Sequence, residues 1–127
     1  MNRYVDQGLV ADMLKGKKIL VLTPLNTSSR HQFNRLEKCL QDRDHHADKI
    51  YRSAGQWSLH LVGSIHIRTI SPWNINTAGR GMSPDIVFVQ DRHYHVAGNK
   101  SGGSEFDLKL HELLKVFDVH GAEVIFE

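Results

Sequence analysis

The sequence has little of several residue types that would assign a protein class at once. It contains one cysteine and three prolines in 127 residues. Because Cys39 is the only cysteine, the chain has no internal disulfide and no thiolate cage for a metal. No apolar run approaches the roughly 20 residues of a membrane-spanning helix, and the opening MNRYVDQGLV lacks the layout of a signal peptide. We therefore expect no membrane partner and a cytoplasmic location in the host cell.

The chain also has little net charge. Its formal charge of +2 is too small to require a nucleic-acid partner, although a local basic patch remains compatible with it. The nine histidines make the charge sensitive to pH, since histidine titrates near pH 6.5. A chain of this length has room for one core, so we expect a single domain that covers residues 1–127.

Three unbroken aliphatic runs dominate the hydropathy pattern. Such runs are typical of strands that are buried on both faces of a parallel sheet. They occupy residues 19–22, 85–89 and 122–126. Helical spacing of apolar residues covers residues 5–14, residues 25–44 and the segment from Ser104 to a stop at Gly121. The order predicts an α/β fold with three layers, a mostly parallel sheet and helices on both faces.

Residues 58–71 have a different pattern, in which apolar and polar side chains alternate on both sides of Gly63-Ser64. This alternation predicts two short strands or a hairpin. His60, His66 and Arg68 share the polar phase, so we expect them on one face of these strands. The preceding QDRDHHADK, residues 41–49, reads as a polar connection.

Three stretches together resemble the ATPase core of phage large terminases and superfamily 2 helicases, a RecA/Rossmann-like fold. KKILVLTPLNTSSRHQFNRLE is similar to the strand and helix that follow the phosphate loop in that family. WSLHLVGSIHIRTIS resembles a hairpin with a Gly-Ser turn, and GRGMSPDIVFVQD resembles an arginine-glycine loop and the Walker B strand. The resemblance implies a role related to DNA packaging or to work on nucleic acids.

Two departures from the family pattern point away from ATP hydrolysis. We expect no phosphate loop, because the sequence opens on a helix without the preceding strand, glycine-rich loop and Lys-Ser/Thr pair. Gln90-Asp91 stands where the family has two acids, and a neutral amide is a poor Mg²⁺ ligand. The sequence therefore predicts a non-hydrolytic, degenerate and phage-derived domain without a cofactor, which acts by binding a protein partner or nucleic acid.

A metal-dependent nuclease, or its inactive descendant, is the alternative. Asp85 before a strand and Lys100 before a helix resemble the PD-(D/E)xK layout, in which carboxylates hold Mg²⁺ and lysine steadies the scissile phosphate. Asp91 is a further candidate catalytic residue. Gly98 stands where the second acid belongs, so Mg²⁺ enters only under this alternative.

A metal site is a separate hypothesis. Asp91, His93 and His95 lie together in an extended segment and supply ligand types that zinc accepts. Four other histidines are available to complete the set: His45, His46, His60 and His66. The competing interpretation is that these histidines are exposed and bind no metal.

Basic residues near the expected ends of strands form the candidate nucleic-acid or partner-binding set. Loops at the carboxyl ends of parallel strands converge on one edge of the sheet. The set comprises Arg30, Arg68, Arg80, Arg92 and Lys100. Trp57 and Trp73 either stack on bases or anchor the core. The lack of a phosphate-loop strand would leave a sheet edge open, which predicts a homo-oligomer.

Overall fold

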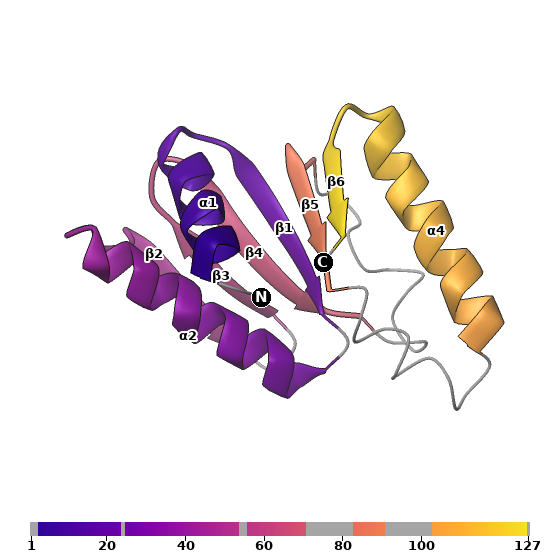
Figure 1. Cartoon of the computed structure of the whole chain (residues 1–127), viewed down its shortest axis with the longest axis horizontal. Helices are drawn as coiled ribbons and strands as arrows, with labels where there is room; N and C mark the ends of the chain where they lie inside the picture. The colour runs from indigo at the N-terminus through magenta and orange to yellow at the C-terminus, as the bar shows by residue number, and fades with distance from the viewer. Residues whose placement is uncertain (1–2, 24, 54–55, 71–82, 91–102, 127) are drawn as a thin grey trace.

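The computed structural model describes residues 3–23, 25–53, 56–70, 83–90 and 103–126. Within these residues the chain forms an α/β domain of three helices and six strands in one sheet (Figure 1). Several residues that the sequence predicts to be functional lie outside the described residues. They are Trp73, Arg80, Asp91, Arg92, His93, His95 and Lys100.

The helices are α1 (Arg3–Leu14), α2 (Asn26–Asp42) and α4 (Gly103–Val119). Two of them are followed by a glycine with positive φ, Gly16 at 95° and Gly121 at 92°. Glycine adopts this conformation without steric strain, which makes it the usual residue just beyond a helix. These three helices confirm the helical spacing in the sequence.

The strands are β1 (Lys18–Thr23), β2 (Lys49–Ser53), β3 (Gln56–His60), β4 (Ser64–Thr69), β5 (Ile86–Val89) and β6 (Glu123–Phe126). They lie in the order β2-β3-β4-β1-β5-β6. Pairing is parallel from β4 through β1 and β5 to β6, whereas β2, β3 and β4 pair antiparallel. The sheet is therefore mixed but mostly parallel, as expected.

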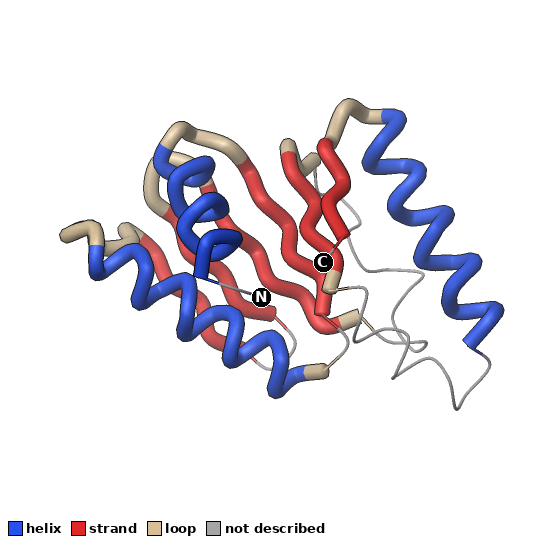
Figure 2. The backbone as a smooth tube through the Cα atoms, viewed as in Figure 1, coloured by secondary structure: helices blue, strands red, loops and turns tan. Residues whose placement is uncertain are grey.

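Two apolar clusters cover opposite faces of the sheet. On one face, α1 and α2 pack over β1, β3 and β4 around Phe33 and Leu36. On the other face, α4 packs with Leu110, Leu114 and Phe117 against β1, β5 and the residue that precedes β6. Figure 2 shows α1 and α2 beside each other at one end of the sheet and α4 at the other end. This division leaves one face of β2–β4 without a described helix.

β2 was not predicted, because only Ile50 and Tyr51 in it are apolar and both are exposed. It pairs antiparallel with β3 over its whole length, and Arg52 adds contacts to α2. The Arg52 guanidinium lies 5.2 Å from the centre of the Phe33 ring, and its Nη2 is 2.7 Å from Glu37 Oε2. Because these contacts come from outside the strand, the sequence of residues 49–53 has little pattern that predicts a strand.

Gly63 allows the turn between β3 and β4 to contact the α1–β1 connection. Its N–H donates to the Met13 carbonyl at 2.9 Å. A Cβ at this position would lie 2.1 Å from the Lys17 carbonyl oxygen, which is far inside van der Waals contact. The turn therefore needs glycine for close packing.

No helix in the described ranges is long and apolar enough to cross a membrane.

Candidate nucleic-acid interface

The face of β2–β4 that points away from α1 and α2 carries a continuous set of polar side chains. Cross-strand partners point to the same face of a sheet, and the register pairs Tyr51 with Ser58 and Ser58 with His66. We call this set the open sheet face. It comprises Lys49, Tyr51, Gln56, Ser58, His60, Ser64, His66 and Arg68.

Three aromatic rings run across the open sheet face. The Tyr51 and His60 rings are 5.7 Å apart at 83°, and the His60 and His66 rings are 5.1 Å apart at 87°. His60 Nε2 and Ser58 Oγ share a hydrogen bond of 3.1 Å. Tyr51 is 55% exposed, so the outermost ring of the row is available to a ligand.

His66 is neutral at physiological pH. Burial, followed by the neighbouring His60 and the positive charge of Arg68, lowers the pKa of His66 from 6.5 to about 4. A neutral imidazole presents one nitrogen as a donor and the other as an acceptor. The His66 ring therefore suits hydrogen bonding to a polar ligand better than ion pairing.

Among the eight residues of this face the fixed charges, those of Lys49 and Arg68, are positive, and the acidic side chain of Asp85 lies at the start of β1, where it accepts a hydrogen bond from the Lys18 backbone N–H. None of the eight residues is acidic, and the Arg68 guanidinium has no ion-pair partner among the described residues. Lys18 at the start of β1 lies next to Ser64 in the register and is exposed. The arrangement favours an anionic ligand.

Two hollows lie on this face and share His60, His66 and Arg68. The first, of about 320 Å³, also contacts Tyr51, and we call it the edge hollow. The second, of about 380 Å³, reaches Lys18 and Ser64, and we call it the central hollow. Both volumes lie at the small end of the range that is typical of ligand pockets.

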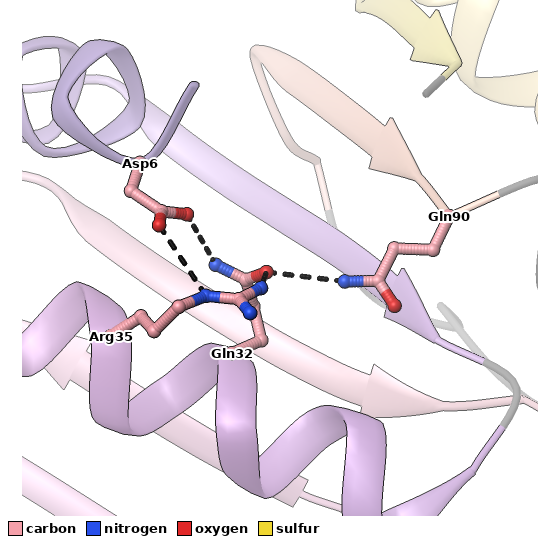
Figure 3. Close-up of polar contacts among 4 residues, drawn as sticks. All are labelled: Asp6, Gln32, Arg35 and Gln90. Carbon is pink, nitrogen blue, oxygen red and sulfur yellow. Dashed lines mark hydrogen bonds and ion pairs between the residues drawn. The ribbon is translucent and has the colours of Figure 1, made fainter. Parts of the chain in front are cut away.

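A second polar region lies beneath α2, at the carboxyl ends of the parallel strands. Asp6 of α1 is 3% exposed and accepts a hydrogen bond of 2.9 Å from Gln32 Nε2. Its other oxygen is 3.4 Å from Arg35 Nε. Gln32 Oε1, the oxygen of its side-chain amide, accepts from Arg35 Nη2 at 2.8 Å and from Gln90 Nε2 at 3.1 Å. Figure 3 shows these four side chains converging from α1, α2 and the end of β5.

This network explains what Gln90 does in the fold. It is 3% exposed, and its amide links β5 to α2. Its Oε1 has no hydrogen-bond partner within the described residues. Next to it, the hydroxyls of Thr23, Ser29 and Thr69 form a hydrogen-bonded row, with 2.8 Å between Ser29 and Thr69. Both groups of contacts are buried or partly buried and join residues of different elements.

Of the predicted basic set, only Arg30 and Arg68 lie within the described residues. Arg68 lies in the open sheet face, as the alternation around Gly63-Ser64 indicated, together with His60 and His66. Arg30 is exposed on α2, which packs against the opposite face. Trp57 is 8% exposed within the core cluster, which confirms its interpretation as a core anchor.

Asp85 directly precedes β5, at the opposite end of that strand from Gln90. Its Oδ2 accepts a hydrogen bond of 2.9 Å from the Lys18 backbone N–H. The carboxylate therefore joins the beginnings of β1 and β5, which gives it a structural function in addition to the catalytic one that the nuclease hypothesis assigns to it.

No group of three or more potential metal ligands occurs in the part of the chain that the structure describes. His60 and His66 are neighbours, but His45 and His46 follow α2 as exposed residues. The central members of the zinc hypothesis, Asp91, His93 and His95, lie outside the described ranges.

Sequence reasoning did not assign five residues to the open sheet face: Lys49, Tyr51, Gln56, Ser58 and Ser64. Ser58 follows the same alternation as His60 and was available from the sequence. Tyr51 was not, because its place depends on the pairing of β2 with β3.

Comparison with protein-family models, with curated proteins and with solved structures found no match.

Proposed function

We propose that this protein binds nucleic acid through the open sheet face and does not hydrolyse ATP. The observation that carries the proposal is a face of eight polar residues with aromatic rings and positive charge but no acidic side chain. Positive charge attracts the phosphate backbone, and aromatic rings stack on bases.

The burial and hydrogen bonding of Gln90 support the proposal that the protein does not hydrolyse ATP. The Gln90 side chain is buried and its amide is bonded to Gln32. A carboxylate that holds Mg²⁺ at this position would require the buried network to rearrange.

Three further proposals come from the sequence: a family relationship, a nuclease activity and self-association. On its motifs, we regard the chain as a RecA/Rossmann-like, phage-derived relative of terminase and helicase ATPase cores. For the nuclease alternative, Mg²⁺-dependent nicking of plasmid that Asp85→Ala abolishes would support catalysis. Self-association through the outer strands β2 or β6 predicts a mass above that of the monomer in light scattering at high concentration.

Salt dependence tests the proposed function. Fluorescence anisotropy with a labelled oligonucleotide should show binding that weakens steeply as NaCl rises from about 50 to about 200 mM, because bound cations release counterions. Arg68→Gln should weaken binding and reduce the slope of log K against log salt by about 1. The matched control is Lys38→Gln on α2, which is exposed on the other side of the sheet.

If Lys38→Gln weakens binding as much as Arg68→Gln does, the open sheet face is not the interface. Arg30→Gln, tested in parallel, separates this face from the edge of the sheet near the start of α2. Loss in Arg30→Gln alone would favour that edge instead.

A further inference from the structure

We infer that the ligand of the open sheet face is a single-stranded nucleic acid, with a base held against Tyr51 in the edge hollow and phosphate held near Arg68 and Lys18. This inference rests on the proposed function and specifies its substrate class. It depends on how rings and charges are distributed across the strands.

Aromatic and cationic groups are separated along the face. The Tyr51 ring lies on β2 at the outer edge of the sheet, whereas Lys18 lies on β1, three strands further in. Neighbouring strands are about 4.8 Å apart, so the two groups are separated by about 14 Å. Arg68 lies on β4, the second strand in from β2, and lines both hollows; it is level with Leu22 of β1, four residues along the strand from Lys18. An extended chain that alternates rings and phosphates can meet both kinds of group.

The edge hollow suits a flat ring with hydrogen-bonding edges. Its volume is about 320 Å³, and the exposed Tyr51 ring stands edge-on to His60. Ser58 and His60 are bonded to each other beside it, and Gln56 lies at the same hollow. Polar groups next to a ring allow the edge of a stacked base to form hydrogen bonds.

A duplex does not fit this arrangement. Its bases are stacked on each other and present their faces only at the two ends, so they cannot stack on Tyr51 along the length of the helix. Double-stranded DNA is otherwise entered by a helix or a ribbon in a groove. The open sheet face is a recessed surface on strands and has no described helix above it.

Competition between single strands and duplex tests the inference. Labelled single-stranded DNA, single-stranded RNA of the same sequence and a hairpin duplex of equal charge are titrated by fluorescence anisotropy. We expect one or both single strands to bind at least tenfold more tightly than the hairpin. The two single-stranded probes distinguish DNA from RNA as the source of the same chemistry.

The Tyr51 ring provides the second arm of the experiment. Tyr51→Ala should weaken single-strand binding by about tenfold or more, since a stacked base contributes on that scale, while Tyr51→Phe should retain it. Tyr51 is exposed on an outer strand, and a thermal melt confirms that both variants fold.

The outcomes separate the two proposals. Equal binding of hairpin and single strands, with loss in Arg68→Gln but none in Tyr51→Ala, overturns the single-strand inference and leaves nucleic-acid binding intact. Absence of binding to every probe at low salt overturns both.

Discussion

At the scale of single residues, His66 links the open sheet face to the stability of the fold. Its pKa of about 4 in the folded protein lies below the ordinary 6.5, so the unfolded chain takes up the proton first as the pH falls. The cause is burial beside His60 and Arg68. His66 is therefore neutral in the folded protein at pH values between about 4 and 6.5, where the histidine of an unfolded chain is protonated.

This shift predicts a pH dependence of stability. The contribution of His66 is fully present above about pH 6.5 and is lost as the pH falls toward 4. The slope is at most about 1.4 kcal/mol per pH unit and is reduced by solvent at this half-buried position. Urea denaturation at several pH values should show a shallower decline for His66→Gln. His31→Gln, at an exposed position on α2, is the control, and an equal change in both variants would contradict the assignment.

At the scale of secondary-structure elements, the Asp6–Gln32–Gln90 network joins α1, α2 and β5. Gln32→Met should lower the free energy of unfolding by about 3 kcal/mol, because it removes partners from the buried carboxylate of Asp6 and from the Gln90 amide. Gln90→Met alone should change the free energy of unfolding by no more than about 1 kcal/mol, because this substitution also removes the Gln90 Oε1 atom, which has no hydrogen-bond partner within the described residues.

The double variant tests the coupling between these two glutamines. Gln32→Met with Gln90→Met should be more stable than the sum of the single effects predicts, by about 1 kcal/mol, because no Gln90 amide is then left unpaired. Strict additivity in denaturant unfolding would show that the contact contributes nothing.

The turn between β3 and β4 gives a second prediction at this scale. Gly63→Ala should destabilise the fold by about 3 kcal/mol, because the added methyl meets the backbone of Lys17 and Gly16. Gly8→Ala is the matched control, because no atom of the described chain beyond its neighbours and the backbone of α1 itself lies within 4 Å of its Cβ position. It should stabilise the helix by up to about 1 kcal/mol. Similar melting temperatures for the two variants would contradict the close approach.

These elements also show what the sequence can predict. The run Ile19–Leu22 is buried on both faces, so its apolar character appears in the sequence without knowledge of its neighbours. β2 is exposed and is held by its pairing with β3 and by the contacts of Arg52 with α2, which leaves no local pattern. The polar phase of His60, His66 and Arg68 was predictable from alternation. The placement of Tyr51 and the convergence of Asp6 on Gln32 depend on strand order and helix packing.

At the scale of the whole molecule, the proposed function depends on the unequal coverage of the sheet by the described helices. α1 and α2 cover one face, and α4 covers the other only around β1, β5 and β6 (Figure 1). The part that no described helix covers carries the rings and the positive charges. The sequence predicted helices on both faces, as observed, and a binding set at the carboxyl edge of the sheet, most of which lies outside the described residues.

Chemical-shift mapping tests this placement most directly. A single-stranded oligonucleotide is titrated into the isotopically labelled protein, and backbone and histidine ring signals are followed by NMR. We predict that the largest shifts occur in β2–β4, at Tyr51, His60, His66 and Arg68. Shifts concentrated at Thr23, Ser29 and Gln90, with β2–β4 unchanged, would contradict binding through the open sheet face.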